Sequence, residues 1–191
     1  LGEFMYVNNF NIPYEDFMEI VADEPTDEEH DYEFENFNPS GNLIPVGGGK
    51  DSVVTLEALR SIHADNICLQ YNRDIYPENL AAHNCITQAG YSMDSIADFN
   101  LTLDKHMLEL NGQGFYNGHI PFSSCLAFSS YIMAYLNNKK YIVLSNEASA
   151  NEGNIAGTQI NHQYSKSFEF ENDFRNYCNE YFTSKIEYFK I

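Results

Sequence analysis

Short apolar runs alternate along this chain with longer segments in which apolar residues recur every three or four positions. The short runs predict β-strands and the longer periodic segments predict α-helices. Strands that alternate with helices favour an α/β fold with three layers, in which a mostly parallel sheet carries helices on both faces. The predicted strands are residues 42–46, 66–71, 91–103 and 141–145. The predicted helices are residues 51–63, 77–89, 104–111, 120–136 and 170–183.

Residues 1–41 differ from the rest of the chain in both pattern and charge. They show no regular periodicity, and Asn-Pro-Ser-Gly at residues 38–41 punctuates the end of the segment. Acidic residues cluster at positions 15–36, and no Lys or Arg occurs before Lys50. We therefore interpret residues 1–41 as an acidic lead-in that is solvated and partly disordered. The alternative is an acidic arm that contacts a partner or cations.

The composition indicates a globular protein with an acidic surface. The chain has 191 residues, of which 43% are hydrophobic, and its formal net charge is −18. Such a charge disfavours a nucleic-acid partner, which needs a basic face. The four cysteines are widely spaced and form no Cys-x-x-Cys pair, as is typical of free thiols in a reducing compartment. No signal peptide or transmembrane stretch is visible, so we expect a cytoplasmic protein without a membrane partner.

A glycine-rich turn joins the first predicted strand to the helix that follows it. Glycine lets the backbone approach a ligand closely, and the start of a helix presents unpaired N–H groups and a partial positive charge. The spacing matches neither the common P-loop nor the Gly-x-Gly-x-x-Gly pattern. It nevertheless predicts an anion site, with an ordinary strand-to-helix turn as the alternative. The residues expected to hold phosphate are Gly47, Gly48, Gly49, Lys50, Asp51 and Ser52.

A second polar segment follows the last predicted strand. Ser-Asn-Glu at residues 145–147 comes directly after the apolar run of residues 141–144. In a parallel sheet, ligands bind beyond the carboxyl ends of the strands. We therefore expect this segment and the turn at residues 47–52 to line one site.

Four segments together resemble a known family of enzymes. The turn resembles the PP-loop of ATP pyrophosphatases, Ser-Gly-Gly-x-Asp-Ser, with Gly47 in place of the first serine. With the other segments, residues 42–190 resemble the bacterial UDP-N-acetylmuramoyl-L-alanyl-L-glutamate epimerases of peptidoglycan synthesis. The other three segments are NGHIP at residues 117–121, LSNEASANE at residues 144–152 and NHQYSKSFE at residues 161–169.

The resemblance implies the fold and extent of the domain. We expect residues 42–191 to form an ATP-binding domain of the adenine nucleotide α-hydrolase-like kind. Because this chain is much shorter than those epimerases, we expect the domain to be truncated at its C-terminus.

The resemblance also implies an isomerase that uses ATP and Mg²⁺ on a small, nucleotide-linked muramoyl peptide. Adenylation of the glutamate carboxylate, with release of pyrophosphate, would remove its negative charge and make the α-proton acidic enough to be moved between faces. Hydrolysis would then release AMP. The alternatives are a PP-loop ligase or amidating enzyme, which passes the adenylate to a nitrogen nucleophile, and a non-catalytic nucleotide-binding module.

The candidate acid and base groups lie in polar loops. His119 and His162 have side chains whose ordinary pKa values suit proton transfer near neutral pH, and Lys166 is a cation for a carboxylate or phosphate. The alternatives are structural loop histidines and a surface lysine.

The candidate substrate and metal ligands are also loop residues. Asp51 and Glu147 are candidate Mg²⁺ ligands, because this hard cation prefers carboxylate oxygens. Asp51 could equally cap its helix, and Glu147 could be a solvated loop acid. The candidate substrate-binding residues are Asn146, Glu147, Asn151 and Tyr164.

Overall fold

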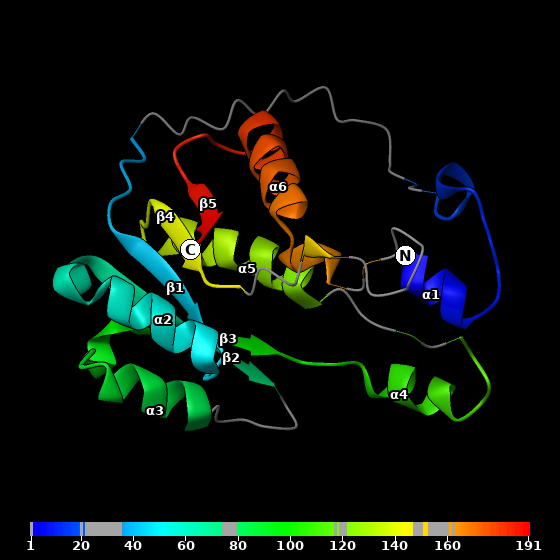
Figure 1. The fold of residues 1–191 in the computed structure, drawn as a ribbon, viewed down its shortest axis with the longest axis horizontal. Helices are drawn as coiled ribbons and strands as arrows, with labels where there is room; N and C mark the ends of the chain where they lie inside the picture. The colour runs from blue at the N-terminus through cyan, green and yellow to red at the C-terminus, as the bar shows by residue number, and fades with distance from the viewer. Residues whose placement is uncertain are drawn as a thin grey trace.

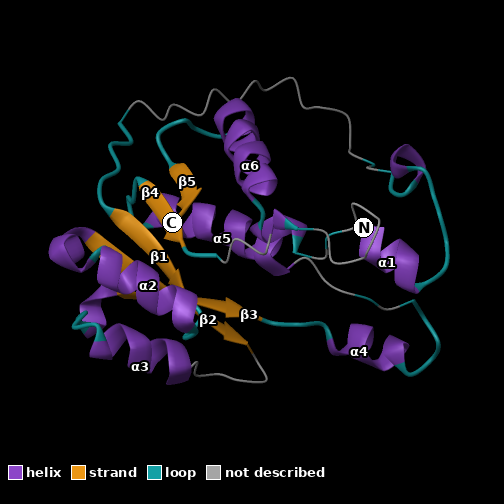
Figure 2. Cartoon of the chain, in the orientation of Figure 1, coloured by secondary structure: helices purple, strands orange, loops and turns teal. Residues whose placement is uncertain are grey.

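The described part of the chain folds around one parallel β-sheet. A computed structural model of the chain describes residues 2–19, 21, 36–73, 80–116, 118, 122–146, 151–152, 161 and 163–191. Five parallel strands lie in the order β3-β2-β1-β4-β5 (Figures 1 and 2). The predicted three-layer α/β fold is confirmed. The strands are β1 (Asn42–Val46), β2 (Asn66–Arg73), β3 (Ile96–Leu101), β4 (Tyr141–Leu144) and β5 (Glu187–Lys190).

Helices cover both faces of the sheet. Helices α2 and α3 lie on one face, α5 and α6 lie on the other, and α1 and α4 lie away from the sheet (Figure 1). Within the described ranges, no helix is long and apolar enough to cross a membrane. The helices are α1 (Gly2–Val7), α2 (Lys50–Ala58), α3 (Leu80–Gln88), α4 (Lys105–Asn111), α5 (Phe122–Leu136) and α6 (Phe168–Tyr181).

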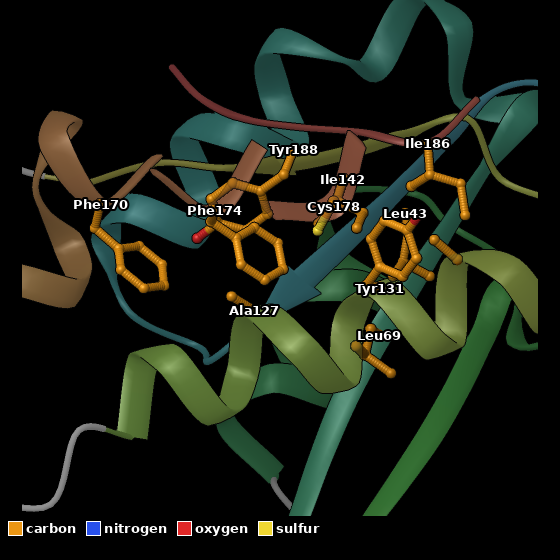
Figure 3. Close-up of a cluster of buried hydrophobic side chains, with 11 residues drawn as sticks. Leu43, Leu69, Ala127, Tyr131, Ile142, Phe170, Phe174, Cys178, Ile186 and Tyr188 are labelled. Carbon is orange, nitrogen blue, oxygen red and sulfur yellow. The ribbon is translucent and has the colours of Figure 1, made fainter. Parts of the chain in front are cut away.

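The central strand β1 separates two hydrophobic cores. Successive side chains of a strand point to opposite faces, so Leu43 enters one core and Ile44 the other. The larger core joins the sheet to α5 and α6, with Tyr131 of α5 and Phe174 of α6 packed over Ile142 and its neighbours (Figure 3). All five residues of β1 are buried, as expected for a strand covered on both faces.

Several predicted boundaries shift in the structure. The helix predicted over residues 51–63 ends at Ala58 and continues as a 3₁₀ segment, η2 (Arg60–Asp65). The side-chain amide of Asn66 donates to the Leu59 carbonyl oxygen at 3.2 Å, which satisfies a carbonyl at this helix end. The strand predicted over residues 91–103 is likewise shorter, because η3 (Met93–Ser95) precedes β3. Residues 77–79, predicted as helical, lie outside the described residues.

The lead-in and the end of the chain carry elements that the sequence pattern did not predict. Helix α1 and the 3₁₀ turn η1 (Tyr14–Asp16) lie in the lead-in, and β5 follows α6. Aromatic contacts hold the lead-in: the rings of Phe4 and Phe10 are 5.6 Å apart, and Phe10 is 5.3 Å from Tyr116. The contact between Phe10 and Tyr116 joins segments that are distant in sequence, so local periodicity could not reveal it.

Candidate functional site

The strand order places the two predicted site segments side by side. The chain runs from β1 to β2 and β3 on one side, then returns to β4 and β5 on the other side of β1. Such a reversal opens a ligand-binding crevice at the carboxyl ends of the two neighbouring strands, here β1 and β4. The hydroxyl oxygens of Thr55 on α2 and Ser145 after β4 are 2.5 Å apart. The turn at residues 47–52 and the end of β4 therefore lie at one edge of the sheet.

The glycine turn packs closely against α3. Gly48 has a φ of +85°, and a Cβ atom there would lie 2.6 Å from the carbonyl carbon of Ala81. The turn therefore requires glycine at this position, because a side chain would overlap backbone and strain the dihedral. The thiol of Cys85 also approaches the Gly48 carbonyl oxygen at 3.6 Å.

The start of α2 remains open to a ligand. Gly49 is the N-cap residue, has extended backbone and supplies no side-chain cap. The Gly47 N–H donates to the Ser52 hydroxyl oxygen at 3.0 Å, which closes the turn over the first residues of the helix. A helix N-terminus without a side-chain cap is suited to an anion, because its N–H groups need acceptors.

Lys50 and Asp51 contact each other at the surface. The Lys50 ammonium donates to the Asp51 carboxylate at 3.0 Å, and the two side chains are 72% and 42% exposed. A surface pair of this kind contributes little free energy, so both groups can turn toward a ligand. Asp51 could then contribute one oxygen ligand to Mg²⁺. Among the described residues, no group of three or more His, Cys, Asp or Glu side chains could hold a metal ion.

Predicted substrate-binding residues gather at the start of α6. The Asn146 side-chain amide donates to the Lys166 carbonyl oxygen at 3.5 Å. The Asn151 side-chain oxygen accepts from the Phe168 N–H at 2.7 Å, and the Ser167 hydroxyl caps α6. The ends of two loops thus meet beside β4.

Tyr164 and Lys166 lie in the 3₁₀ turn η5 (Tyr164–Lys166), just before α6. The Tyr164 hydroxyl donates to the Asp173 carboxylate at 2.5 Å. Burial raises the pKa of Tyr164 above its ordinary value, and the bond to Asp173 raises it further. Tyr164 therefore stays protonated near neutral pH and acts as a hydrogen-bond donor rather than as a base.

Three predicted site residues lie outside the described residues. They are His119, His162 and Glu147. Their roles in proton transfer and metal binding stay predictions.

Sequence reasoning missed a lysine at this edge of the sheet. Lys190 ends β5 and pairs with Leu144, the residue before Ser145, in the parallel register. Its ammonium donates to the Ser167 carbonyl oxygen at 2.9 Å. Burial lowers the pKa of Lys190 to about 8, although the nearby Glu171 carboxylate acts to raise it. The only sequence signal was a lysine after the aromatic pair at residues 188–189.

A polar network on β2 and β3 was also missed. The side-chain amide of Asn72 donates to Asp98 at 3.0 Å and to Asn100 at 3.2 Å. Gln70 donates to Asn72 at 3.2 Å, and both of these side chains are buried. These residues extend the polar character of the carboxyl edge beyond the glycine turn.

Comparisons with known proteins agree on one family. The model of the MurL N-terminal domain family matches residues 1–191. Proteins named UDP-N-acetyl-alpha-D-muramoyl-L-alanyl-L-glutamate epimerase are similar to the chain: that of Xanthomonas oryzae pv. oryzae is 32% identical over 151 residues, and that of Salinispora tropica is 35% identical over 153. The protein of this name from a Micromonospora species is 36% identical over 131 residues.

These matches cover most of the chain but a minority of each relative. They include 78%, 78% and 68% of this chain, in the same order, and 32%, 31% and 28% of the relatives. The chain therefore spans about a third of the length of the curated relatives that it matches.

Proposed function

The chain belongs to the MurL N-terminal domain family, and on this premise we propose that it forms the ATP-binding part of an epimerase. The proposed substrate is the glutamate residue of UDP-N-acetylmuramoyl-L-alanyl-L-glutamate, the compound in the names of the relatives. The observation that carries the proposal is the glycine turn at the β1–β4 switch point, where Thr55 of the following helix contacts Ser145. This is where α/β sheets bind nucleotides.

Phosphate binding is proposed for the turn at residues 47–52, in the manner of a PP-loop. The open space at Gly49, where no atom lies within 4 Å of the ideal Cβ position, and the uncapped start of α2 fit an oxyanion. Lys50 would add a cation, and the Ser52 hydroxyl would donate to phosphate while it accepts from Gly47. Mg²⁺ would take a carboxylate oxygen from Asp51, with Glu147 as the second candidate ligand.

ATP would supply an adenylate leaving group for the substrate carboxylate. Inversion at an α-carbon needs the proton to leave one face and return on the other, and a free carboxylate makes that proton a very weak acid. His119 and His162 are the proposed acid and base groups, because the ordinary pKa of a histidine side chain lies near neutral pH. Lys166 and Asn151 are proposed to orient the substrate from the start of α6.

The proposed compartment is the cytoplasm, where ATP and nucleotide-linked precursors meet. The described cysteines Cys68, Cys85, Cys125 and Cys178 are all free thiols. Free thiols are typical of a reducing compartment.

One reaction tests the proposal. The protein is incubated with ATP, MgCl₂ and UDP-N-acetylmuramoyl-L-alanyl-L-glutamate in D₂O, and mass spectrometry follows AMP and deuterium at the glutamate α-carbon. We expect AMP release together with deuterium incorporation. AMP without deuterium would replace the epimerase with an enzyme that transfers the adenylate to another nucleophile. The absence of both signals would favour the alternative that this chain by itself is a non-catalytic nucleotide-binding module.

Two double variants test whether the glycine turn binds ATP, without requiring catalysis. We expect Lys50→Ala combined with Ser52→Ala to weaken ATP binding at least tenfold, as measured by isothermal titration calorimetry. The matched control is Lys105→Ala combined with Ser92→Ala, because Lys105 is the first residue of α4 as Lys50 is of α2. Equal affinity of both double variants for ATP would exclude this turn as the phosphate site.

A further inference from the structure

Lys190 lies where three segments of the candidate site meet. Strand β5 pairs with β4 so that Lys190 lies beside Leu144, and the Ile191 N–H donates to the Leu144 carbonyl oxygen at 2.8 Å. The Lys190 ammonium reaches across to the carbonyl of Ser167, the N-cap residue of α6. The end of β4, the η5 turn and the end of β5 are thereby held together at the carboxyl edge of the sheet.

The surroundings of Lys190 are apolar and only partly compensate its charge. The ammonium lies 5.5 Å from the ring centroid of Phe170 and 5.7 Å from that of Tyr188. Glu171 is buried on α6, but its carboxylate lies 3.8 Å from the Arg175 guanidinium. Among the described residues, the Ser167 carbonyl is the one hydrogen-bond acceptor of Lys190, and no carboxylate lies within 4 Å of its ammonium.

An ammonium group has three N–H donors. A half-buried cation that uses one donor on a backbone carbonyl can direct the others to an anion, and an apolar surrounding strengthens that attraction. Strands lie about 4.8 Å apart, so the ends of β1 and β5, two strand spacings apart, are separated by roughly 10 Å. The Lys190 ammonium lies on the α6 face of the sheet and α2 on the other, so a ligand that contacts both Lys190 and the glycine turn would pass over the carboxyl end of β4.

We propose that Lys190 is an anion-binding residue of this site and holds an oxyanion of the ligand, either a substrate carboxylate or a phosphate. The choice of these two ligands depends on the function proposed above. Lys190 extends the site across β4 to β5, beyond the residues identified in the loops.

The test measures binding to the wild-type protein and to three variants. Lys190→Met keeps most of the aliphatic stem and removes the charge, whereas Lys190→Arg keeps a cation. Lys185→Met is the matched control, because Lys185 also donates to a backbone carbonyl at 2.9 Å, that of Phe37, before the opposite end of β5. Titration calorimetry at pH 7 uses α,β-methylene-ATP with MgCl₂, and separately the glutamyl substrate.

We expect Lys190→Met to weaken binding of at least one ligand tenfold or more, as a lost charge-assisted hydrogen bond does. Lys190→Arg should restore part of the affinity, and Lys185→Met should bind as the wild type does. A loss confined to the glutamyl substrate assigns a carboxylate to Lys190, and a loss confined to the ATP analogue assigns a phosphate. Affinities of Lys190→Met within twofold of the wild type for both ligands would overturn the proposal.

A pH profile separates binding from a structural role. The charged and titratable groups around Lys190 are Glu171 and Arg175 on α6, Tyr188 on β5, and Tyr164 and Lys166 in η5. Affinity of the wild type for the anion should fall several-fold between pH 7 and pH 9 as Lys190 loses its proton, whereas Lys190→Arg should show a smaller change. An equal pH dependence in the two proteins would contradict anion binding by Lys190.

The proposal for Lys190 and the proposed function can fail independently of each other. If AMP and deuterium are absent but Lys190→Met loses affinity, the epimerase proposal fails and the binding residue stands. If the reaction occurs and affinity is unchanged in Lys190→Met, the binding residue fails alone.

Discussion

Individual residues set the shape of the proposed phosphate site, and Gly48 is the most constrained of them. Its φ of +85° is strained for any residue with a side chain, and a Cβ atom would overlap the backbone of Ala81 and Ala82. We expect Gly48→Ala to lower the free energy of unfolding by about 2–4 kcal/mol, from backbone strain and overpacking together. Urea denaturation followed by circular dichroism measures this change.

Gly49 provides the control for that substitution. It has extended backbone, and no atom lies within 4 Å of its ideal Cβ position. Alanine is a poorer N-cap than glycine but lowers the entropy of the unfolded chain, so Gly49→Ala should change stability by less than about 1 kcal/mol. Equal losses in the two variants would contradict the close approach between Gly48 and α3.

The half-buried ammonium of Lys190 predicts a pH effect on stability. Burial holds its pKa at about 8, below the ordinary value of 10.5, so between these values the unfolded chain binds more protons than the folded one. The stability of the wild type relative to Lys190→Met should therefore rise from pH 8 to pH 10. Because the side chain is only partly buried, we expect the difference in the free energy of unfolding between the two proteins to rise by about 1 kcal/mol.

Urea denaturation of both proteins at pH 7, 8, 9 and 10 measures this difference. The raised pKa values of Tyr164 and Tyr188 affect both proteins alike and cancel in the comparison. A difference that stays constant or falls with pH would show that the folded protein does not lower the pKa of Lys190.

Elements defined by strong local patterns were predicted well from the sequence, and those defined by distant contacts were not. Residues 42–46 are β1 as predicted, because the apolar run at residues 43–46 is typical of a strand buried on both faces. Strand β5 was missed, since four residues at an edge strand show little pattern, and α1 was missed because its six residues, none of them buried, show no apolar periodicity.

The same distinction applies to the candidate site. The glycine turn and Ser145 lie at the same edge of the sheet, as a general rule for parallel sheets predicts, and Thr55 of the helix after the turn contacts Ser145. Lys190 could be placed only once the register between β4 and β5 was known.

Packing of α5 against the turn before β5 depends on one buried hydroxyl. Tyr131 donates to the Thr183 carbonyl oxygen at 2.9 Å and accepts from the Thr183 N–H at 3.1 Å. Burial raises the pKa of Tyr131 to about 12, so this hydroxyl keeps its proton over the working range. Tyr131→Phe should lower the free energy of unfolding by about 1–3 kcal/mol, because it leaves the N–H and the carbonyl of Thr183 without this partner.

Thermal and urea unfolding of Tyr131→Phe measure that cost. Tyr177→Phe on α6 is the control, since Tyr177 is partly exposed and keeps its ring contacts as phenylalanine. A cost for Tyr131→Phe no larger than that for Tyr177→Phe would contradict the structural role of the hydroxyl.

For the whole molecule, the parallel sheet arranges the candidate site, whereas the acidic charge affects stability. The sheet brings the glycine turn after β1, the segment after β4 and Lys190 of β5 to a single edge, so residues far apart in sequence come together there. The formal net charge of −18 contributes nothing to that arrangement but opposes compaction through repulsion between carboxylates. The proposed anionic ligands would therefore have to be attracted locally, and Lys50, Lys166 and Lys190 are the cations proposed for this role.

Repulsion across the molecule predicts that salt stabilises the fold. The ion pairs among the described residues mostly involve exposed side chains, such as Lys50 with Asp51 and Arg60 with Glu57. Screening of these attractions by salt therefore lowers the free energy of unfolding only slightly. Raising NaCl from 20 to 300 mM should increase the free energy of unfolding by about 1 kcal/mol, because the Debye length shortens from about 20 Å to below 10 Å. Urea denaturation at the two salt concentrations measures the increase.

The control for this prediction removes charge without touching the core. Glu15→Gln, Asp16→Asn and Glu19→Gln alter exposed side chains and change the formal charge from −18 to −15. Salting-out of apolar surface would stabilise the wild type and this triple variant equally, whereas screening of repulsion should stabilise the variant less. The difference in salt response between the two proteins therefore isolates the electrostatic term. An equal response, or a wild type that loses stability in salt, would show that repulsion between carboxylates does not limit the stability of this fold.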